Sequence, residues 1–593
     1  MPKKYNTPNV YETEIDISEI TTPAGTSTGA ITAPFPKGPV NRPVLVTSDK
    51  QFVEKFGEPA VSGSDLIYGY GAYAALEFLK ESDALYVVRA AVASEDFFAA
   101  NGISTEVTAT TIAAIGASAG PVPDKADLIY AIDNTVMPAT TDMIVGAISP
   151  GDWGNDIAIT VESLTSASDW LFQYDDLPVG VSPSAVETSA MTIARRVFKV
   201  SVFTKSSSDS WTDFKVDKVG TSALSIVPIE SFYGTLRVQL DGNNQQLFIK
   251  DVINGNSNYI YVDVNSNATV FEQTYNPIVK TSANEVLGID ERALISLTGG
   301  VAVPKTGLGT YYSQWEYLTD KQNYDINIVI IPDYSTTVKQ QVVQNVVGSR
   351  KDCIAVAQVG SYANNTLESV LNAEKYGYTD PSYIALYAGW DKVYDKYNSR
   401  NVFLPKSIFG AALMARTDDV ANVWDAPAGM SRGIIPSSEQ NKLFDFSEIG
   451  QLYDRNINTS RLIRGVGHVM WGQKTAQMKK SALDRINVRR LLLFIRKSME
   501  EALLPYVLDV NNTAKTRLRI WSNLDAFLAT IQAEGGLLKY EVVCNESNNP
   551  AEVIDSNQLN VDVYVQPVKT VEFISLQTIV TKTGVNFEEV RVR

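Results

Sequence analysis

The sequence predicts a multidomain protein in which an α/β body carries an all-β insertion. Three observations predict this class. The chain has 593 residues, which is more than one ordinary domain holds. Apolar strand-like runs alternate with amphipathic helical runs on both sides of the middle, as is typical of a largely parallel sheet. Between them, residues 94–285 are rich in Thr, Ser, Val, Asp and Asn and show short alternating runs with few helical patterns.

The composition argues against several classes of function. Hydrophobic residues make up 45% and charged residues 20%, which is typical of globular protein rather than disorder. A net charge of -16 disfavours direct binding of nucleic acid, because phosphate is repelled. The sequence holds one histidine, His468, which disfavours most triad and multi-histidine metal sites within one chain. Neither a phosphate-binding loop nor a dinucleotide fingerprint occurs, so we expect no enzyme and no cofactor.

Cysteine usage and hydropathy predict a protein made in a reducing compartment. Cys353 and Cys544 lie far apart in the sequence and match neither a disulfide framework nor a zinc pattern, so we expect two buried, reduced thiols. The first residues lack the apolar core of a signal peptide, and no stretch approaches the roughly 18 apolar residues of a membrane span. We therefore expect a protein that does not insert into membranes and is not exported by a cleaved signal.

Residues 1–30 predict an N-terminal extended arm. Residues 10–17 alternate with period two, and residues 21–29 read as a flexible joint. Two interpretations stay open: an ordinary first strand, or an arm that adds to another subunit's sheet. The residues that carry this strand are Val10, Tyr11, Thr13, Ile15 and Ile17.

Residues 31–93 and 286–475 together predict the α/β body. In the first stretch, Ser48 is a plausible helix N-cap and Gly57 a stop, and a second helix and the buried strand ALYVVRA follow. In the second, INIVIIPD reads as a buried parallel strand, TTVKQQVVQNVVGSR as a helix and DCIAVAQV as the next strand. This strand–helix–strand order predicts a right-handed crossover.

Residues 94–285 predict one or two sandwich-like β domains. The runs RVFKVSVFTK, TLRVQLDG, QQLFIKDV and NYIYVDVN read as strands, joined by the turn-forming sequences DGNN and NGNSN. The alternative is that these strands extend the main sheet.

Residues 476–580 predict an α+β unit, and residues 581–593 an extended C-terminal arm. Asn511 and Asn512 interrupt two helical segments, and the second helix ends at Gly535. Two strand runs follow, LLKYEVVCN and LNVDVYVQPVKTVEFISLQTIVT. The apolar positions of the arm are Val585, Phe587 and Val590.

Several local sequences, taken in order, resemble one family. They are TSTGAITAPFPKGPVNRPVLVTSDKQFVEKFG, LYVVRA, SPGDWGNDIAITV, SLTGG, NIVIIPD, MARTDDVANVWDAPAG, RGVGHVMWGQKTA, DRINVRRLL, EGGLLKYEVVCNESNNP, VIDSNQLNVDVYVQPVKTVEFI and TGVNFEEV. The chain resembles the tail sheath proteins of contractile-tailed bacteriophages, especially the T-even type. The resemblance is strongest over residues 464–590 and weakest in the β-rich insertion.

The resemblance implies a structural subunit that stacks as hexameric rings into a helical sleeve and contracts to drive a tail tube through the host envelope. It implies an inner C-terminal domain, an α/β middle domain and an outer insertion. The implied partners are further copies that exchange arms, the tail tube protein, and baseplate and tail terminator proteins. The implied location is the virion tail, assembled in the host cytoplasm. Two other interpretations remain: a sheath of a related bacteriocin or secretion machine, and a multidomain enzyme with a sandwich-type substrate domain.

A basic helical stretch at residues 484–497 is the candidate contact with the tube. Its cations could meet an acidic tube through exposed ion pairs worth about 0–1 kcal/mol each, weak enough to release on contraction. The alternative is a solvated face with partners inside the same chain. The basic residues are Arg485, Arg489, Arg490, Arg496 and Lys497.

Overall fold

The computed structural model describes residues 25–576 with internal gaps, the longest at 117–142, 164–197, 265–293 and 302–311. The chain forms two compact units. The larger one, here the α/β unit, comprises Gly25–Ala421 and Pro427–Ile486. The smaller one, here the C-terminal unit, comprises the described residues from Asn487 onward together with the short peptide Asn422–Ala426.

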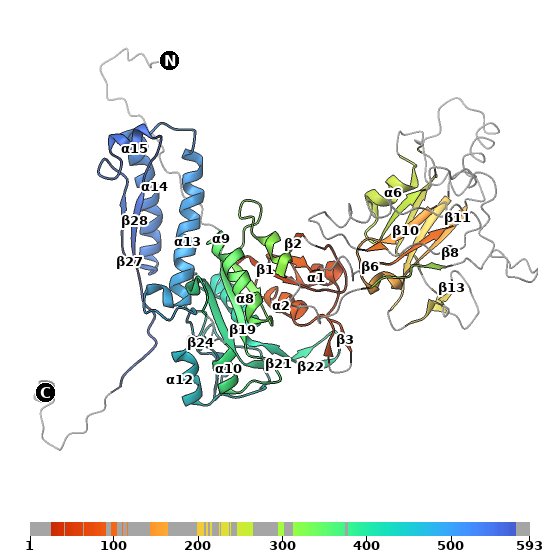
Figure 1. The fold of residues 1–593 in the computed structure, drawn as a ribbon, viewed down its shortest axis with the longest axis horizontal. Helices are drawn as coiled ribbons and strands as arrows, with labels where there is room; N and C mark the ends of the chain where they lie inside the picture. Colours follow the sequence, from red (N-terminus) through yellow and green to blue (C-terminus); the bar gives the residue numbers. More distant parts are fainter. Residues whose placement is uncertain are drawn as a thin grey trace, which may run out of the picture. The chain divides into compact units, whose positions relative to one another are not determined.

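The α/β unit is built on a seven-stranded sheet in the order β2-β5-β1-β18-β19-β20-β24 (Figure 1). All neighbours are parallel except β2, which runs antiparallel to β5 at the edge. The strands are β1 (Gly29–Ala33), β2 (Pro43–Val46), β5 (Leu85–Arg89), β18 (Ile328–Ile331), β19 (Ile354–Val359), β20 (Ile384–Ala388) and β24 (Ile457–Asn458). The predicted parallel strands ALYVVRA, INIVIIPD and DCIAVAQV therefore lie in one sheet.

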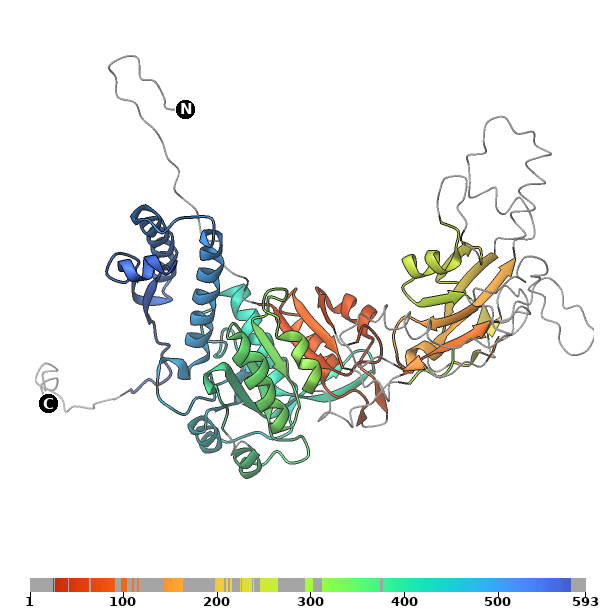
Figure 2. The same ribbon diagram turned by 45° about the horizontal axis from the view of Figure 1, so that its top comes forward.

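Helices cover both faces of this sheet (Figures 1 and 2). On one face, α2 (Gly71–Phe78) packs with α11 (Lys406–Val420). On the other, a core that includes Trp315, Val342 and Leu452 brings further helices against the strands. They are α7 (Tyr312–Trp315), α8 (Thr336–Gln341), α9 (Gly348–Arg350), α10 (Leu367–Ala373) and α12 (Phe446–Asp454). Burial on both faces explains why the strand sequences are continuously apolar.

The predicted helix boundaries in this unit are confirmed. In α1 (Asp49–Phe56), the Ser48 side chain accepts a hydrogen bond from Gln51 N, and the helix ends at Gly57. The predicted helix TTVKQQVVQNVVGSR begins at α8, where Ser335 caps Val338 N, and runs through a π-helical stretch, Val342–Val347, into α9.

The β-rich part holds two four-stranded sheets that share one apolar core. Their orders are β16-β10-β7-β8 and β15-β12-β11-β17, and Val145, Ile159, Val200 and Val262 meet between them. The strands are β7 (Ala100–Ile103), β8 (Ala109–Thr110), β10 (Met143–Ala147), β11 (Ile157–Ser163), β12 (Phe198–Thr204), β15 (Glu230–Gly234), β16 (Ile260–Val264) and β17 (Ile295–Ser296). β17 pairs with β11, so this part includes residues beyond the predicted limit at 285.

One predicted strand here is wrong. The run QQLFIKDV leads into the helix α6 (Ile249–Asn256) instead of forming a strand. Ile249 and Ile253, one helical turn apart, are both buried in the shared core, so tertiary packing selects the helix over the local β propensity. Most of the predicted strand TLRVQLDG lies outside the described residues, whereas RVFKVSVFTK and NYIYVDVN contain β12 and β16.

The β-rich part joins the α/β sheet through the guanidinium of Arg89 at the end of β5. This side chain is 1% exposed and donates to four backbone carbonyls, those of Phe35, Pro36, Gly38 and Pro150. The motif SPGDWGND supplies Pro150 and also Asn155, which bonds both the N–H and the carbonyl of Gly300 in the motif SLTGG. Two sequences singled out above thus form one fixed junction.

Short strand pairs complete the larger unit. The pairs are β3 (Val61–Ser62) with β4 (Asp65–Leu66), β6 (Phe97–Phe98) with β9 (Ile115–Gly116), β13 (Phe214–Lys215) with β14 (Leu224–Ser225), and β25 (Ser460–Ile463) with β26 (Gly467–Met470). A three-stranded sheet contains β21 (Trp390–Asp395), β22 (Arg400–Pro405) and β23 (Glu439–Gln440).

The C-terminal unit packs two long helices and a two-stranded antiparallel sheet. The elements are α13 (Ile486–Leu503), α14 (Ala514–Ala533), β27 (Leu537–Val543), α15 (Ala551–Asp555) and β28 (Asp562–Pro567). The core joins Leu491 and Ile495 of α13 to Leu524 and Leu528 of α14 and to Val542 of β27. The break at residues 511 and 512 and the helix stop at 535 agree with the sequence prediction.

The last predicted strand is shorter than expected. It ends at Pro567, and residues 568–576 form no strand among the described residues. Cys353 and Cys544 are both buried free thiols, as predicted. The described residues contain no helix that is both long and apolar enough to cross a membrane.

Candidate functional site

The predicted basic face of α13 is only partly at the surface. Arg489 is 7% exposed and Arg490 is 4% exposed, so both are buried. Arg485 precedes the helix and forms an ion pair with Asp484 at 3.1 Å. Arg496 is exposed, and Lys497 is half-buried. The five cations therefore do not form one exposed surface, although the contact with a tube stays a prediction.

Burial also changes the chemistry of this helix. Desolvation lowers the pKa of Lys497 to about 8, although the carboxylates of Glu501 and Glu500 act in the opposite direction. Near neutral pH Lys497 is therefore still charged, and the burial of that charge destabilises the folded unit. Arg496 is the cation of the set that the structure leaves in water.

The predicted arm residues lie outside the described part of the chain. They are Val10, Tyr11, Thr13, Ile15, Ile17, Val585, Phe587 and Val590. Their role stays a prediction.

The two-stranded sheet covers α14 with one face and exposes the other (Figure 1). On the covered face, Leu537 and Val542 belong to the core, and Trp521 of α14 donates its indole N–H to Val542 O at 3.0 Å. On the open face, Leu538 is 55% exposed and Tyr564 is 62% exposed. Within the described residues, β27 pairs only with β28, so each strand keeps one edge without a strand partner. Side chains cap part of the β27 backbone, since Gln532 Nε2 donates to Leu538 O at 2.9 Å in addition to the bond from Trp521.

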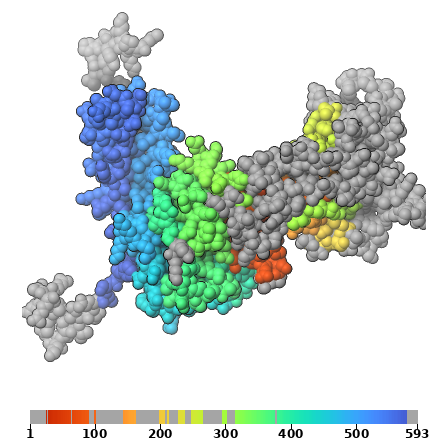
Figure 3. Space-filling view, viewed as in Figure 1, coloured from red at the N-terminus to blue at the C-terminus, as the bar shows by residue number. Residues whose placement is uncertain are grey.

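An extended apolar segment follows this sheet. Figures 1 and 3 show the trace after β28 running on beyond the packed helices and strands of the C-terminal unit. Val571, Phe573, Ile574 and Leu576 are 75%, 80%, 85% and 88% exposed. Isolated exposed apolar residues are common on proteins, but four of them within six residues of extended chain indicate a surface that another segment covers.

Asparagine side chains shape the turn that returns the chain to β28. Asn548 Nδ2 donates to the carbonyls of Val543 and Asn560, and Asn549 Oδ1 accepts from Asn560 N at 2.7 Å. These bonds satisfy backbone groups that an 18-residue connection would otherwise leave to water. The sequence shows the asparagine cluster in CNESNNP, but its partners lie on both sides of the connection.

A peptide from the middle of the chain completes the C-terminal unit. The ring of Trp424, in Asn422–Ala426, lies 6.4 Å from the ring of Phe494 on α13. Asn487 Nδ2 donates to Trp424 O at 3.0 Å. A Cβ at Gly536 would lie 2.9 Å from the Trp424 ring, so glycine is needed where β27 begins. Sequence reasoning missed this anchor, because no local pattern links residue 424 to residue 536.

The larger unit offers one buried cluster with nucleophile-like chemistry. Lys406 Nζ donates to Asp391 Oδ2 and to Ser460 Oγ, both at 2.6 Å, and Gln440 Nε2 donates to Asp391 Oδ1 at 3.0 Å. A lysine can activate a serine, but Ser460 is 1% exposed and Lys406 is also 1% exposed. No substrate reaches these atoms, and the cluster instead ties α11 to β21 and β25.

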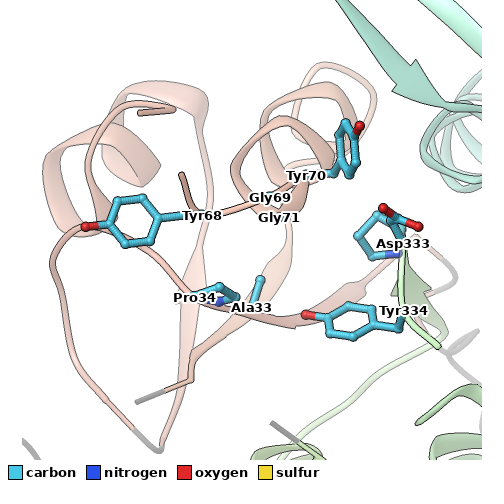
Figure 4. Close-up of a pocket in the computed structure, with 9 residues that line it drawn as sticks. Ala33, Pro34, Tyr68, Gly69, Tyr70, Gly71, Asp333 and Tyr334 are labelled. Atoms are coloured by element: carbon cyan, nitrogen blue, oxygen red, sulfur yellow. The ribbon is translucent and has the colours of Figure 1, made fainter. Parts of the chain in front are cut away.

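Among the described residues, the space at the carboxyl ends of β1 and β18 is too small to hold a ligand larger than water. The connections leave β1 and β18 in opposite directions, so the crevice between these strands is where open α/β sheets usually bind ligands. Here the space is about 10 Å³, room for one water molecule. Tyr334 lines this space (Figure 4). Its hydroxyl donates to Thr32 O at 2.6 Å. Burial raises the pKa of Tyr70 beside it, as does the carboxylate of Asp333.

The remaining candidate, His468, has a structural environment. It is 8% exposed, lies in β26, and burial lowers its pKa, with Asp391 acting in the opposite direction and Lys406 in the same direction. Across the described ranges, no group of three or more His, Cys, Asp or Glu residues is arranged to hold a metal ion.

The family comparison concerns the same C-terminal elements. Residues 478–581 match the phage tail sheath C-terminal domain. The predicted resemblance to phage tail sheath proteins is confirmed. The matched range contains α13, α14, β27 and β28, as well as the exposed segment after β28.

Two relatives extend the similarity beyond that domain. A tail sheath protein of Vibrio phage KVP40 is 31% identical over 318 residues, which cover 49% of this chain and 47% of the relative. The chain thus spans about half the length of that curated relative in the match. A tail sheath protein of Salmonella phage ViI is 23% identical over an alignment that covers 98% of this chain and 97% of the relative.

A solved structure supports the fold. The sheath tail protein from Desulfitobacterium hafniense has a TM-score of 0.50 and 12% sequence identity, covering 96% of this chain and 98% of that chain. At this identity the likeness concerns the fold alone. It agrees with the predicted mixed α/β content in several sheets.

Proposed function

We propose that the chain is a structural subunit of a contractile phage tail sheath. It polymerises as hexameric rings in a helical sleeve around the tail tube and contracts to drive the tube through the host envelope. One observation carries the proposal: the elements that match the tail sheath domain end in a two-stranded sheet with open edges and an exposed apolar segment. Further support comes from relatives that are named tail sheath proteins.

The proposed partners follow from this role. They are further copies of the chain, the tail tube protein, and baseplate and tail terminator proteins. The proposed layout is an inner C-terminal domain, an α/β middle domain and an outer β-rich insertion. The subunit is assembled in the host cytoplasm, resides in the virion tail and performs no catalysis. The match to the tail sheath C-terminal domain and the relatives named tail sheath proteins support the last point.

Strand addition is the proposed link between copies. The arms at residues 10–17 and 581–593 add to the open edges of β27 and β28 in neighbouring subunits. Each backbone hydrogen bond contributes about 0.5–1.5 kcal/mol net, so the several bonds of one added strand hold firmly. The joint predicted at residues 21–29 is too long at its end, because Thr28 O accepts from Asn327 N at 2.9 Å and Gly29 begins β1. We propose that the residues before Thr28 let the rigid units move while this link persists.

Contraction needs an energy source, and the sequence shows no nucleotide-binding motif. We assign the energy to the lattice itself. The extended sleeve is metastable and relaxes into an arrangement that buries more interface between copies.

Truncations test the strand-addition step. Deleting residues 1–20 should abolish sleeves in negative-stain electron micrographs while leaving folded, soluble monomer by size-exclusion chromatography. Deleting residues 581–593 should also abolish sleeves, because assembly needs both arms. A matched control removes residues 1–4, which lie before the predicted strand. Normal sleeves from both long deletions would contradict strand addition.

The tube contact has its own test. Arg496→Glu should leave the subunit folded but reduce assembly on purified tubes, because this exposed cation faces no burial constraint. Lys515→Glu, at an exposed position on α14, is the matched control. Arg489 and Arg490 are unsuitable, since reversing a buried charge would unfold the unit. Unchanged assembly of the Arg496 variant would remove the basic helix from the proposal.

A further inference from the structure

Three side chains of the α/β unit form a stacked cluster at its surface. The guanidinium of Arg461 lies over the ring of Phe446, 5.4 Å from its centroid, and over the ring of Trp471, 5.6 Å from its centroid. Phe446 is 76% exposed and Trp471 is 38% exposed. We call these three residues, with Arg464 in the adjoining turn, the Arg461 patch.

The patch stands on a rigid support. Arg461 lies in β25, which begins at Ser460, the residue held by the buried Lys406. The partner strand β26 is fixed on its other side, because Met470 N donates to Gly433 O at 2.7 Å and Ile435 N donates to His468 O at 2.9 Å. The backbone of β25 and β26 is therefore held in place before a partner binds, which reduces the conformational entropy lost on association.

The composition of the patch is that of an interface centre. Arginine, tryptophan and other aromatic residues dominate the binding energy of protein interfaces, and stacking on aromatic rings holds a guanidinium in place for a partner. Arg461 and Arg464 are exposed, and neither has an ion-pair partner among the described residues. The patch thus presents two positive charges that its own unit does not neutralise.

We propose that the Arg461 patch docks against an acidic surface of a second copy of this chain. The chain carries 67 acidic and 51 basic side chains, so its copies repel one another unless a positive surface meets a negative one. The patch cannot meet itself, since that would oppose arginines to arginines. We infer a head-to-tail contact, because the proposed assembly into rings and a sleeve needs contacts that repeat from copy to copy rather than close into two-fold dimers. This inference rests on the proposed self-assembly.

The test uses the purified full-length protein alone, so that a second copy is the only partner present. Assembly is followed by pelleting and electron microscopy across protein and salt concentration. For R461E/R464E we expect the concentration needed for assembly to rise about tenfold or more. For R461Q/R464Q we expect a smaller rise and a weaker dependence on salt, because the ionic contribution is lost. The matched control is K50E/K55E, which reverses two charges on α1 of the same unit.

Mixing separates a head-to-tail contact from misfolding. A folded R461E/R464E subunit keeps its acidic surface, so it should enter wild-type sleeves and shorten them. Assembly of R461E/R464E at the wild-type concentration, or its exclusion from wild-type sleeves, would overturn the inference while leaving the proposed function standing. Failure of the wild-type protein itself to form sleeves would overturn the proposed function, and the inference with it. Circular dichroism and thermal unfolding of each monomer confirm that the variants fold.

Discussion

The sheet of the α/β unit is covered on both faces, whereas the sheet of the C-terminal unit is covered on one face only. Every residue of β18 is 0% exposed, and helices cover both faces of that sheet. In β28 the residues alternate between exposed and half-buried, and none is buried. Both sheets end in strands that have one neighbour among the described residues, but the α/β sheet has both faces covered, whereas the C-terminal sheet has one open face. Stability is thus concentrated in the first sheet, and capacity for association in the second.

The largest expected effect tests how fully the α/β unit is closed. Lys406→Met leaves Asp391, which is 0% exposed, as an uncompensated buried charge, so we expect a loss of about 3–5 kcal/mol in the free energy of unfolding. Urea unfolding of the monomer measures it. The control is Lys392→Met, which removes a partly exposed pair with Glu439 and should cost less than about 1 kcal/mol. Equal losses of unfolding free energy in the two variants would mean that the buried pair contributes no more to stability than the exposed pair.

The next effect tests whether the C-terminal unit depends on the Trp424 peptide. Trp424→Ala removes a half-buried ring that contacts Phe494 and the Gly536 backbone, so we expect a loss of about 2–3 kcal/mol. Hydrogen exchange should locate the loss in α13, α14 and β27. As a control, Trp521→Phe keeps most of the ring volume and loses one hydrogen bond, costing about 1 kcal/mol. Increased exchange confined to the seven-stranded sheet would refute the assignment.

A smaller effect depends on pH and concerns Lys497. Its pKa is about 8 in the folded unit, below the ordinary value of 10.5, because burial disfavours the cation. The unfolded chain therefore binds more protons between these pH values, and stability rises as pH rises through this window. Lys497→Met removes the cost, so we expect it to stabilise the unit by about 1–2 kcal/mol near pH 7 and to lose this advantage above the upper value. If Lys497→Met stabilised the unit equally at high pH, the stabilisation would come from better packing and not from removal of the buried charge.

The smallest effect on stability concerns the open face of the C-terminal sheet. Tyr564→Ser and Leu538→Ser alter side chains that are 62% and 55% exposed, so each should change the free energy of unfolding by no more than about 0.5 kcal/mol. The same variants should raise the concentration needed for sleeve formation if this face is covered in the assembly. Val542→Ser, on the covered face, is the contrasting control, since it should destabilise the monomer. Substantial destabilisation by Tyr564→Ser would show that the face is already covered.

Periodicity predicted the α/β unit well, because its elements have strong local signals. The continuous apolar run of β18, the cap at Ser48 and the stop at Gly57 each follow from neighbouring residues. The helix α6 was predicted as a strand, since Ile249 and Ile253 take helical spacing only against the sandwich core. The strand expected after Pro567 is absent there among the described residues, where β28 pairs with β27 and with no further strand.

In the candidate basic helix, too, some features follow from local sequence and others depend on tertiary packing. Its position and its charged composition follow from the sequence, but the burial of Arg489 and Arg490 does not, because it depends on which faces of α13 pack within the unit. The Trp424 anchor and the Arg461 patch were not predicted at all. Each joins residues from separate parts of the chain, so no window of sequence contains the contact.

The sequence by itself determined the class of the fold, the acidic balance, the scarcity of catalytic groups and the resemblance to tail sheath proteins. These properties are set by composition, by periodicity and by the order of local motifs. The tertiary structure alone decided which cations stay in water, which carboxylate neutralises Lys406, and which sheet is left open. Those outcomes depend on burial and on contacts between distant residues, which arise only when the chain packs.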